Sequence, residues 1–424
     1  MNRWNRWTLL VFWLLGICAF AQQMRVCDQE VKSVRMMMDG VACDFPVIPL
    51  DGRKVIEVSF DDLRHDYREF YYHIEHVSAD FEPSDGIFES DYVRAADDRL
   101  PVLQYEPSMS TSVLYNHYSF QIPNAEMRPL ISGNYKLVVN AENEDGEEEV
   151  AFETYFAVTE QSAPIILNAT TNTEIDHNNC HQQLELEVET GAFNLYRPEE
   201  EILIRARQNG RWIDEVFGVR PTAQMGTRLL WQHSRDLIFP AGNEFRRFEQ
   251  FSVRYPGLKV DRVGYEAPYY YTTLMSDRVR RNYLYQEDQN GVWVVRSEYS
   301  GDADTGADYM WTRFTLESPL LQGMEVYIDG MWTGHQLVDD YRMTYNQSEG
   351  CYEAVVLLKQ GYYSYQYIAV PTRVSVQRFS LTAPVEGDFY QTENRYDVYV
   401  YLRERGARYD RLVGWRMGKI NAKQ

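Results

Sequence analysis

The sequence predicts an all-β protein made of tandem antiparallel β-sandwiches, and two patterns carry this prediction. Short runs alternate apolar with polar residues at a period of two, and they are rich in β-branched and aromatic side chains, as in residues 55–60, 135–139, 184–188 and 396–401. Such alternation is typical of strands that bury one face. We find no long apolar stripe with helical spacing, so strands follow one another directly, which favours antiparallel sheets.

Glycine-containing turn signals separate these runs. Asn209-Gly210, Asn290-Gly291 and Asp329-Gly330 are three examples. Type I′ hairpin turns need a positive φ at both central residues, and Asn-Gly and Asp-Gly meet this requirement. The expected elements are therefore hairpins.

Composition narrows the function classes. The 424 residues are 44% apolar and 14% aromatic, which excludes a wholly disordered chain. The net charge is −21. Because so acidic a surface repels nucleic-acid phosphates and anionic lipid headgroups, we expect neither nucleic-acid binding nor direct lipid insertion.

Residues 1–21 have the features of a secretory signal peptide. Two arginines precede an apolar segment, residues 8–18, that is too short to span a membrane, and residues 19–21 (Ala-Phe-Ala) form a small-x-small cleavage site. The bulky Ile17 before the first cysteine does not fit lipoprotein processing. We therefore expect an exported chain without a lipid anchor.

Cleavage would leave four cysteines. Cys27 and Cys43 are near enough in sequence to close a small loop by a disulfide, which an exported chain permits, and free or buried thiols are the equal alternative. Cys180 and Cys351 lie far apart in the chain. No pair has Cys-x-x-Cys spacing, so we expect no zinc or redox centre at these residues.

We expect three β domains after the signal peptide. The first covers residues 22–160 and closes with a strand at 154–158. A linker opens the second, residues 161–275, and the third covers residues 276–424 and includes the C-terminal strands.

Residues suited to catalysis or metal binding are sparse. His73 and His76 flank Glu75, but on a strand the two histidines point to opposite faces and cannot share a metal. The sequence contains no nucleophile elbow, zinc-protease, phosphate-loop or dinucleotide motif. We expect no catalytic residues, no metal, no cofactor and no small-molecule substrate.

Three stretches of the third domain form one pattern: residues 326–332, 350–353 and 358–367. A strand leads to a Gly-aromatic turn, and a later Gly-Tyr-Tyr-x-Tyr strand builds the opposite sheet. Together these stretches resemble the early-set, immunoglobulin-like fold of glycogen-binding modules. We expect Gly361 at a bend, with Tyr363, Tyr365 and Tyr367 on one face.

Met331 and Trp332 follow a predicted turn and are our candidates for exposed, partner-binding residues. Exposed aromatic side chains favour recognition of protein or sugar surfaces. One hypothesis for the function is therefore a periplasmic carbohydrate-binding protein that uses the third domain.

A second set of stretches extends over nearly the whole mature chain: residues 66–76, 79–84, 118–124, 130–135, 239–246, 358–363, 386–387, 391–394 and 408–414. Taken together, these stretches are similar to the plug protein of the Bacteroidetes type IX secretion system. Val77-Ser78, where the family often has Cys-Asn, and Phe81, where it usually has Trp, depart from the pattern.

This resemblance implies a non-enzymatic role in the periplasm, at the inner face of the outer membrane. Members of the family bind the periplasmic side of a very large translocon barrel and close its pore when no cargo is passing. The barrel is thus the implied partner.

We predict that the signal peptide is removed after Ala21, because the small-x-small site ends there. Mass spectrometry of the protein purified from the periplasm should show Gln22, free or cyclised, at the N-terminus. A diacylglycerol-modified Cys18 would contradict the prediction.

Overall fold

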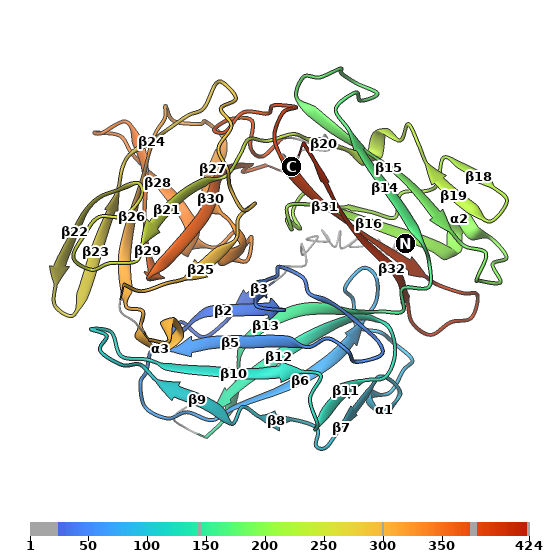
Figure 1. Cartoon of the computed structure of the whole chain (residues 1–424), viewed down its shortest axis with the longest axis horizontal. Helices are drawn as coiled ribbons and strands as arrows, with labels where there is room; N and C mark the ends of the chain where they lie inside the picture. Colours follow the sequence, from blue (N-terminus) through green and yellow to red (C-terminus); the bar gives the residue numbers. More distant parts are fainter. Residues whose placement is uncertain (1–23, 143–145, 299–300, 374–379, 422–424) are drawn as a thin grey trace, which may run out of the picture.

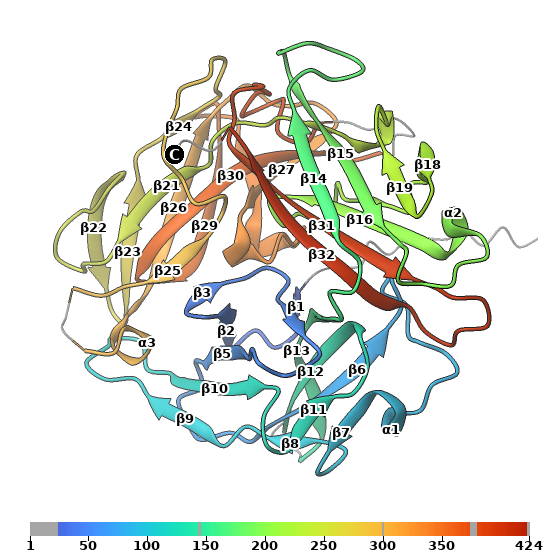
Figure 2. The same cartoon turned by 45° about the vertical axis from the view of Figure 1, so that its right-hand side comes forward.

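The computed structural model describes residues 24–142, 146–298, 301–373 and 380–421, and it consists almost entirely of strands (Figure 1). Most strand pairs are antiparallel, which confirms the predicted all-β class. The expected signal peptide lies outside the described residues. Figures 1 and 2 show three groups of sheets around a common centre, coloured blue to cyan, green with dark red, and yellow to orange.

The first unit (residues 24–160) is a sandwich of two main sheets. One has the order β1-β13-β12-β6-β8, with β4 paired in parallel to β13, and the other has the order β3-β2-β5-β10-β9. Because alternate residues of each strand point inward, the rings of Phe60, Phe70, Tyr118 and Phe152 pack together in its core. The elements are β1 (Met24–Val26), β2 (Val31–Met38), β3 (Val41–Ala42), β4 (Val47–Pro49), β5 (Ile56–Asp62), β6 (Phe70–Val77), α1 (Glu89–Tyr92), β7 (Val93–Ala95), β8 (Leu100–Pro101), β9 (Gln104–Pro107), β10 (Asn116–Ile122), β11 (Met127–Pro129), β12 (Gly133–Glu142) and β13 (Glu148–Thr159).

The second unit (residues 164–240 and 394–420) packs the sheet β14-β15-β19-β18 against the sheet β17-β16-β31-β32. Trp231, Phe239 and Tyr396 belong to its buried core. The elements are β14 (Ile165–Thr170), β15 (His181–Glu189), α2 (Pro198–Glu201), β16 (Ile202–Gln208), β17 (Val216–Phe217), β18 (Ala223–Met225), β19 (Arg228–Trp231), η1 (Arg235–Leu237), β20 (Ile238–Pro240), β31 (Asn394–Leu402) and β32 (Arg411–Ile420).

The third unit (residues 246–371) is a ten-stranded sheet with the main order β21-β30-β27-β28-β29-β26-β23-β22. Tyr363, Tyr365 and Tyr367 of β30 are all buried in its core, which confirms the predicted shared face. The elements are β21 (Arg246–Gln250), β22 (Val260–Glu266), β23 (Tyr269–Leu274), β24 (Asp277–Arg278), β25 (Trp293–Val295), α3 (Ala303–Gly306), β26 (Tyr309–Glu317), β27 (Met324–Asp329), η2 (Met331–Thr333), η3 (Asp339–Tyr341), β28 (Arg342–Asn346), β29 (Cys351–Lys359) and β30 (Gly361–Pro371).

Strand pairing groups two segments differently from the sequence-based blocks. β31 pairs with β16 along its length, so the C-terminal hairpin of β31 and β32 belongs to the second unit and not to the third. β21 pairs with β30, which places residues 246–250 in the third unit. Among the described residues, no helix is both long and apolar enough to cross a membrane.

We predict that Gly361→Ala lowers the free energy of unfolding by about 1–3 kcal/mol, because overpacking costs that much. A Cβ atom at Gly361 would lie 2.3 Å from the carbonyl oxygen of Val294, on the facing strand β25. Gly264→Ala in β22 is the matched control, since a Cβ atom there has no neighbour within 4 Å. Equal denaturation midpoints for the two variants would contradict the close approach.

Candidate functional site at the centre of the three units

Side chains from all three units meet in the middle of the molecule. Asp44 lies between β3 and β4 of the first unit, Arg395 in β31 of the second, and Asp329 and His335 on either side of η2 in the third. His335 Nδ1 is 2.7 Å from Asp329 Oδ1, and His335 Nε2 is 3.4 Å from Asp44 Oδ1. An Arg395 guanidinium nitrogen is 2.7 Å from Asp44 Oδ2. We call these four residues the central junction.

The charges of the central junction balance one another, as buried charges must. Burial favours the neutral imidazole, but the carboxylates of Asp329 and Asp44 outweigh it and raise the pKa of His335 to about 9. Burial also opposes ionisation of Asp44, but His335 and Arg395 outweigh it and lower the pKa of that carboxyl. At neutral pH His335 is therefore an imidazolium, which stabilises an ion pair and cannot accept a proton as a general base.

A second buried charge group joins the first and third units. Asp61 of β5 accepts hydrogen bonds from Lys359 Nζ of β29 and from the Tyr309 hydroxyl of β26, each at 2.6 Å. His117 Nδ1 of β10 lies 2.6 Å from the other Asp61 oxygen. Burial opposes ionisation of Asp61, but Lys359 and His117 outweigh it and lower the pKa of the carboxyl. The first and third units are thus joined by charge as well as by apolar contact.

Aromatic rings dominate the contact between the first and second units. Phe45 and Phe81 of the first unit pack against Trp212 of the second, with ring centroids 5.7 and 4.4 Å apart. The Arg207 guanidinium lies 3.6 Å from the centroid of the Trp212 ring. The Arg207 side chain is buried within this cluster, and its guanidinium also lies 4.9 Å from the Phe45 ring centroid and 5.5 Å from that of Phe81.

The segment 380–393 crosses from the third unit to the second and is held by a buried carboxylate. Glu386 accepts hydrogen bonds from the guanidinium groups of Arg246, at 2.9 Å, and Arg280, at 2.6 Å. Burial opposes its ionisation, but the two arginines outweigh it and lower the pKa of Glu386 to about 2. The carboxylate therefore stays charged down to strongly acidic pH.

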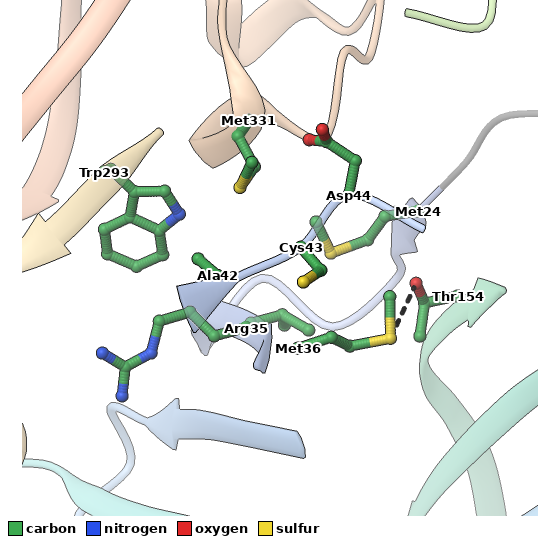
Figure 3. Close-up of a pocket in the computed structure, with 11 residues that line it drawn as sticks. Met24, Arg35, Met36, Ala42, Cys43, Asp44, Thr154, Trp293 and Met331 are labelled. Carbon is green, nitrogen blue, oxygen red and sulfur yellow. Dashed lines mark hydrogen bonds between the residues drawn. The ribbon is translucent and has the colours of Figure 1, made fainter. Parts of the chain in front are cut away.

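Figure 3 shows a small cavity beside the central junction, between the first and third units. Met24, Met36, Trp293 and Met331 are among the residues that line a space of about 20 Å³. That volume holds about one water molecule, so neither a sugar ring nor an organic cofactor fits.

A wider groove of about 620 Å³ opens between the same two units. Tyr269, Trp311 and Tyr341 of the third unit and Lys32 and Glu30 of the first are among its lining residues. Its size is in the range of small-ligand sites. A test of sugar binding should therefore be directed at this groove.

The expectation that Met331 and Trp332 are exposed is wrong. They are 6% and 8% exposed, because η2 folds back under β30 and the Trp332 indole Nε1 donates a hydrogen bond to the carbonyl oxygen of Ser364. Turn residues are usually exposed, but this turn faces the centre of the molecule.

The four cysteines in the described part of the chain are free thiols. Cys27 is exposed and Cys43 is partly buried, so the disulfide between them is not formed and the free-thiol alternative describes this pair. Burial, with the nearby Asp44 carboxylate, raises the pKa of the Cys43 thiol to about 11. A thiol this weakly acidic is protonated at neutral pH and is a poor nucleophile.

The two histidines of β6 point to opposite faces, as predicted. His73 is partly exposed and lies 3.5 Å from Glu75, whereas His76 is buried between Ser84 and Ser132. Burial lowers the pKa of His76 to about 4. It is therefore neutral at physiological pH and separated from any metal that His73 could reach.

Sequence reasoning missed the central junction and the Asp61 group altogether. Asp44, Asp61 and Asp329 are three of 63 acidic residues, and nothing local distinguishes a buried one. Lys359 is the exception, since it directly follows the apolar run at 354–358, and a charge at the end of such a run is a usable signal.

The fold is that of a multi-unit β-sandwich protein held together by buried ion pairs. Residues 31–160 match the family model described as type 9 secretion system plug protein 1st domain. A crystal structure of a hypothetical protein from Parabacteroides merdae ATCC 43184 is similar, with 34% sequence identity and a TM-score of 0.89, over 94% of this chain and 99% of that chain. The chain belongs to the type IX secretion system plug protein family, and its role is associated with type IX secretion.

Two other comparisons add nothing to this assignment. The crystal structure of BcpA, the major pilin subunit of Bacillus cereus, matches with 7% identity and a TM-score of 0.16, over 50% of this chain and 56% of that chain, and these values carry no argument. A search of curated proteins finds no match.

We predict that His335 stabilises the fold below about pH 6.5 and that this stabilisation is lost as the pH rises through about 9. Its pKa is about 9 when folded, against an ordinary value of 6.5, so protonation favours the folded state. His335→Gln should lower stability at pH 6, and its difference from the wild type should shrink by roughly 3 kcal/mol by pH 10.

His76 provides the opposite case, because its lowered pKa makes protonation favour unfolding. As the pH falls below 6.5, the free energy of unfolding should therefore decrease less for His76→Gln than for the wild type. Above pH 6.5 the two proteins should have the same pH dependence. Thermal unfolding of the wild type and both variants from pH 4 to 10 measures this. An effect of His335→Gln that is constant from pH 6 to 10 would contradict the raised pKa.

Proposed function

We propose that this protein is a non-enzymatic plug that binds the periplasmic side of the type IX translocon barrel and closes its pore when no cargo is passing. The observation that carries the proposal is membership of the plug family, whose first-domain model covers residues 31–160. In this chain that domain contacts both other units through buried groups, so the three units would act together.

The chemistry of the molecular centre supports a mechanical role. His335 is held as an imidazolium and Cys43 as a protonated thiol, so neither is activated for acid–base or nucleophilic catalysis. The adjacent cavity holds about one water molecule. A plug must keep its shape without a bound ligand, and internal ion pairs can hold the three units in place for this purpose.

Closing and opening of the pore require that the protein bind the idle barrel more tightly than the cargo-engaged barrel, because a ligand shifts an equilibrium only through differential affinity. A stable contact of this kind buries more than about 1,000 Å² of surface in all. The strongly acidic chain, with a net charge of −21, would meet a complementary basic rim on its partner. The location that follows is the periplasm, at the inner face of the outer membrane.

The structure supports carbohydrate binding less than the sequence did. The two residues proposed for it, Met331 and Trp332, are buried and cannot form a platform for a sugar. The groove lined by Tyr269 and Trp311 is large enough to hold a sugar.

We predict that deleting the gene makes the outer membrane permeable to a large antibiotic while cargo secretion is largely retained. A stopper is needed when the pore is idle and leaves when cargo enters, so its loss exposes the channel without blocking transport. Antibiotic sensitivity and secreted cargo can be measured in the deletion strain, the parent and a strain complemented with the wild-type chain.

Removal of the barrel as well is the decisive control. If the leak runs through the barrel, the strain lacking both proteins should regain the resistance of the parent. A deletion strain as resistant as the parent, or a leak that persists without the barrel, would overturn the plug proposal. Unchanged permeability with impaired growth on one polysaccharide would favour the carbohydrate-binding alternative.

A further inference from the structure

The turn between β14 and β15 brings three metal-ligating side chains together at one end of the second unit. Asp176, Cys180 and His181 each offer one ligand atom, and these atoms all lie within 4.8 Å of one another. Cys180 Sγ is 3.3 Å from Asp176 Oδ2 and 3.4 Å from His181 Nδ1, and the last two atoms are 2.7 Å apart. All three residues are partly exposed, so a cation can reach them from solvent.

We propose that Asp176, Cys180 and His181 form a binding site for one zinc-class divalent cation. Thiolate, imidazole and carboxylate together are a donor set that zinc and cobalt prefer. With ordinary zinc–ligand bond lengths, tetrahedral geometry separates the ligand atoms by about 3.3–3.6 Å. The two distances from sulfur already fall near this range, and only the Asp176–His181 pair must open slightly. Three protein ligands leave the fourth position to water.

The surrounding hydrogen bonds hold the three residues in place. His181 is the first residue of β15 and pairs with Pro240 of β20, while the carbonyl oxygen of Cys180 accepts a hydrogen bond from the backbone N–H of Ala241 at 2.9 Å. The second carboxylate oxygen of Asp176 accepts one from the Thr173 hydroxyl at 2.9 Å. A site on an anchored strand end loses little conformational freedom when it binds its ion.

Metal binding must release the thiol proton, because the ligand is the thiolate. A divalent cation between these side chains favours the thiolate through its own charge.

The sequence-based expectation of no metal rested on the lack of Cys-x-x-Cys pairs and on the opposite orientations of His73 and His76. The ligands here are one residue of each kind within the six residues 176–181. Only the turn, which reverses the chain between Asp176 and Cys180, reveals that they converge.

Cobalt(II) titration of the purified mature chain, in a reducing and non-chelating buffer, tests the proposal. We expect one equivalent of Co²⁺ to produce a thiolate-to-cobalt charge-transfer band in the near ultraviolet, and we expect Zn²⁺ to displace the Co²⁺ and remove the band. Cys180→Ser should abolish the band, whereas Cys27→Ser, which removes an exposed cysteine elsewhere, should leave it unchanged.

A second variant, His181→Gln, keeps the thiol and should weaken Co²⁺ binding at least tenfold. It provides an independent test of the site if Cys180→Ser does not fold. Thermal unfolding by circular dichroism without metal establishes that each variant is folded. The absence of the band in the wild type, or a band lost in Cys27→Ser and kept in Cys180→Ser, would overturn the proposal. The outcome does not depend on the plug function, since it is read on the isolated protein.

Discussion

Asp44, Asp329, His335 and Arg395 form an ion group to which every unit of the molecule contributes, and the arrangement of the units depends on it. Each of these charges is tolerable in the interior only while its partners are in place. A shift of one unit against the others would leave carboxylates without cations in a medium that solvates them poorly. Buried ion pairs often add little net stability compared with apolar packing. Their effect here is on position, because they make one relative placement of the three units much better than its neighbours.

The alternation of apolar and polar residues predicted the strands well, because it indicates which face of a strand is buried. The face of Tyr363, Tyr365 and Tyr367 and the opposite orientations of His73 and His76 both follow from this period. The error at Trp332 has a physical origin. A turn normally lies on the surface of its own sandwich, but this turn points toward the other units. The local sequence of one sandwich does not reveal which residues of another unit will cover its turns.

The central junction could not be predicted for a related reason. Its residues come from positions 44, 329, 335 and 395, and each is ordinary in its local context. Their partnership arises from the docking of whole units, a property of the tertiary structure. Lys359 alone carried a local signal, since its position after an apolar run indicates a buried charge that needs a partner.

The pairing of β31 with β16 links the last part of the chain to its middle. Without residues 394–402, β16 pairs only with the short strand β17. The edge that β31 would occupy then has unpaired backbone groups, to which a strand of another chain could bind. A chain interrupted before this point therefore cannot close its second sandwich, and it lacks Arg395 as well. The three-unit structure can therefore form only after the chain has been made through residues 394–420, and a shorter fragment cannot adopt it.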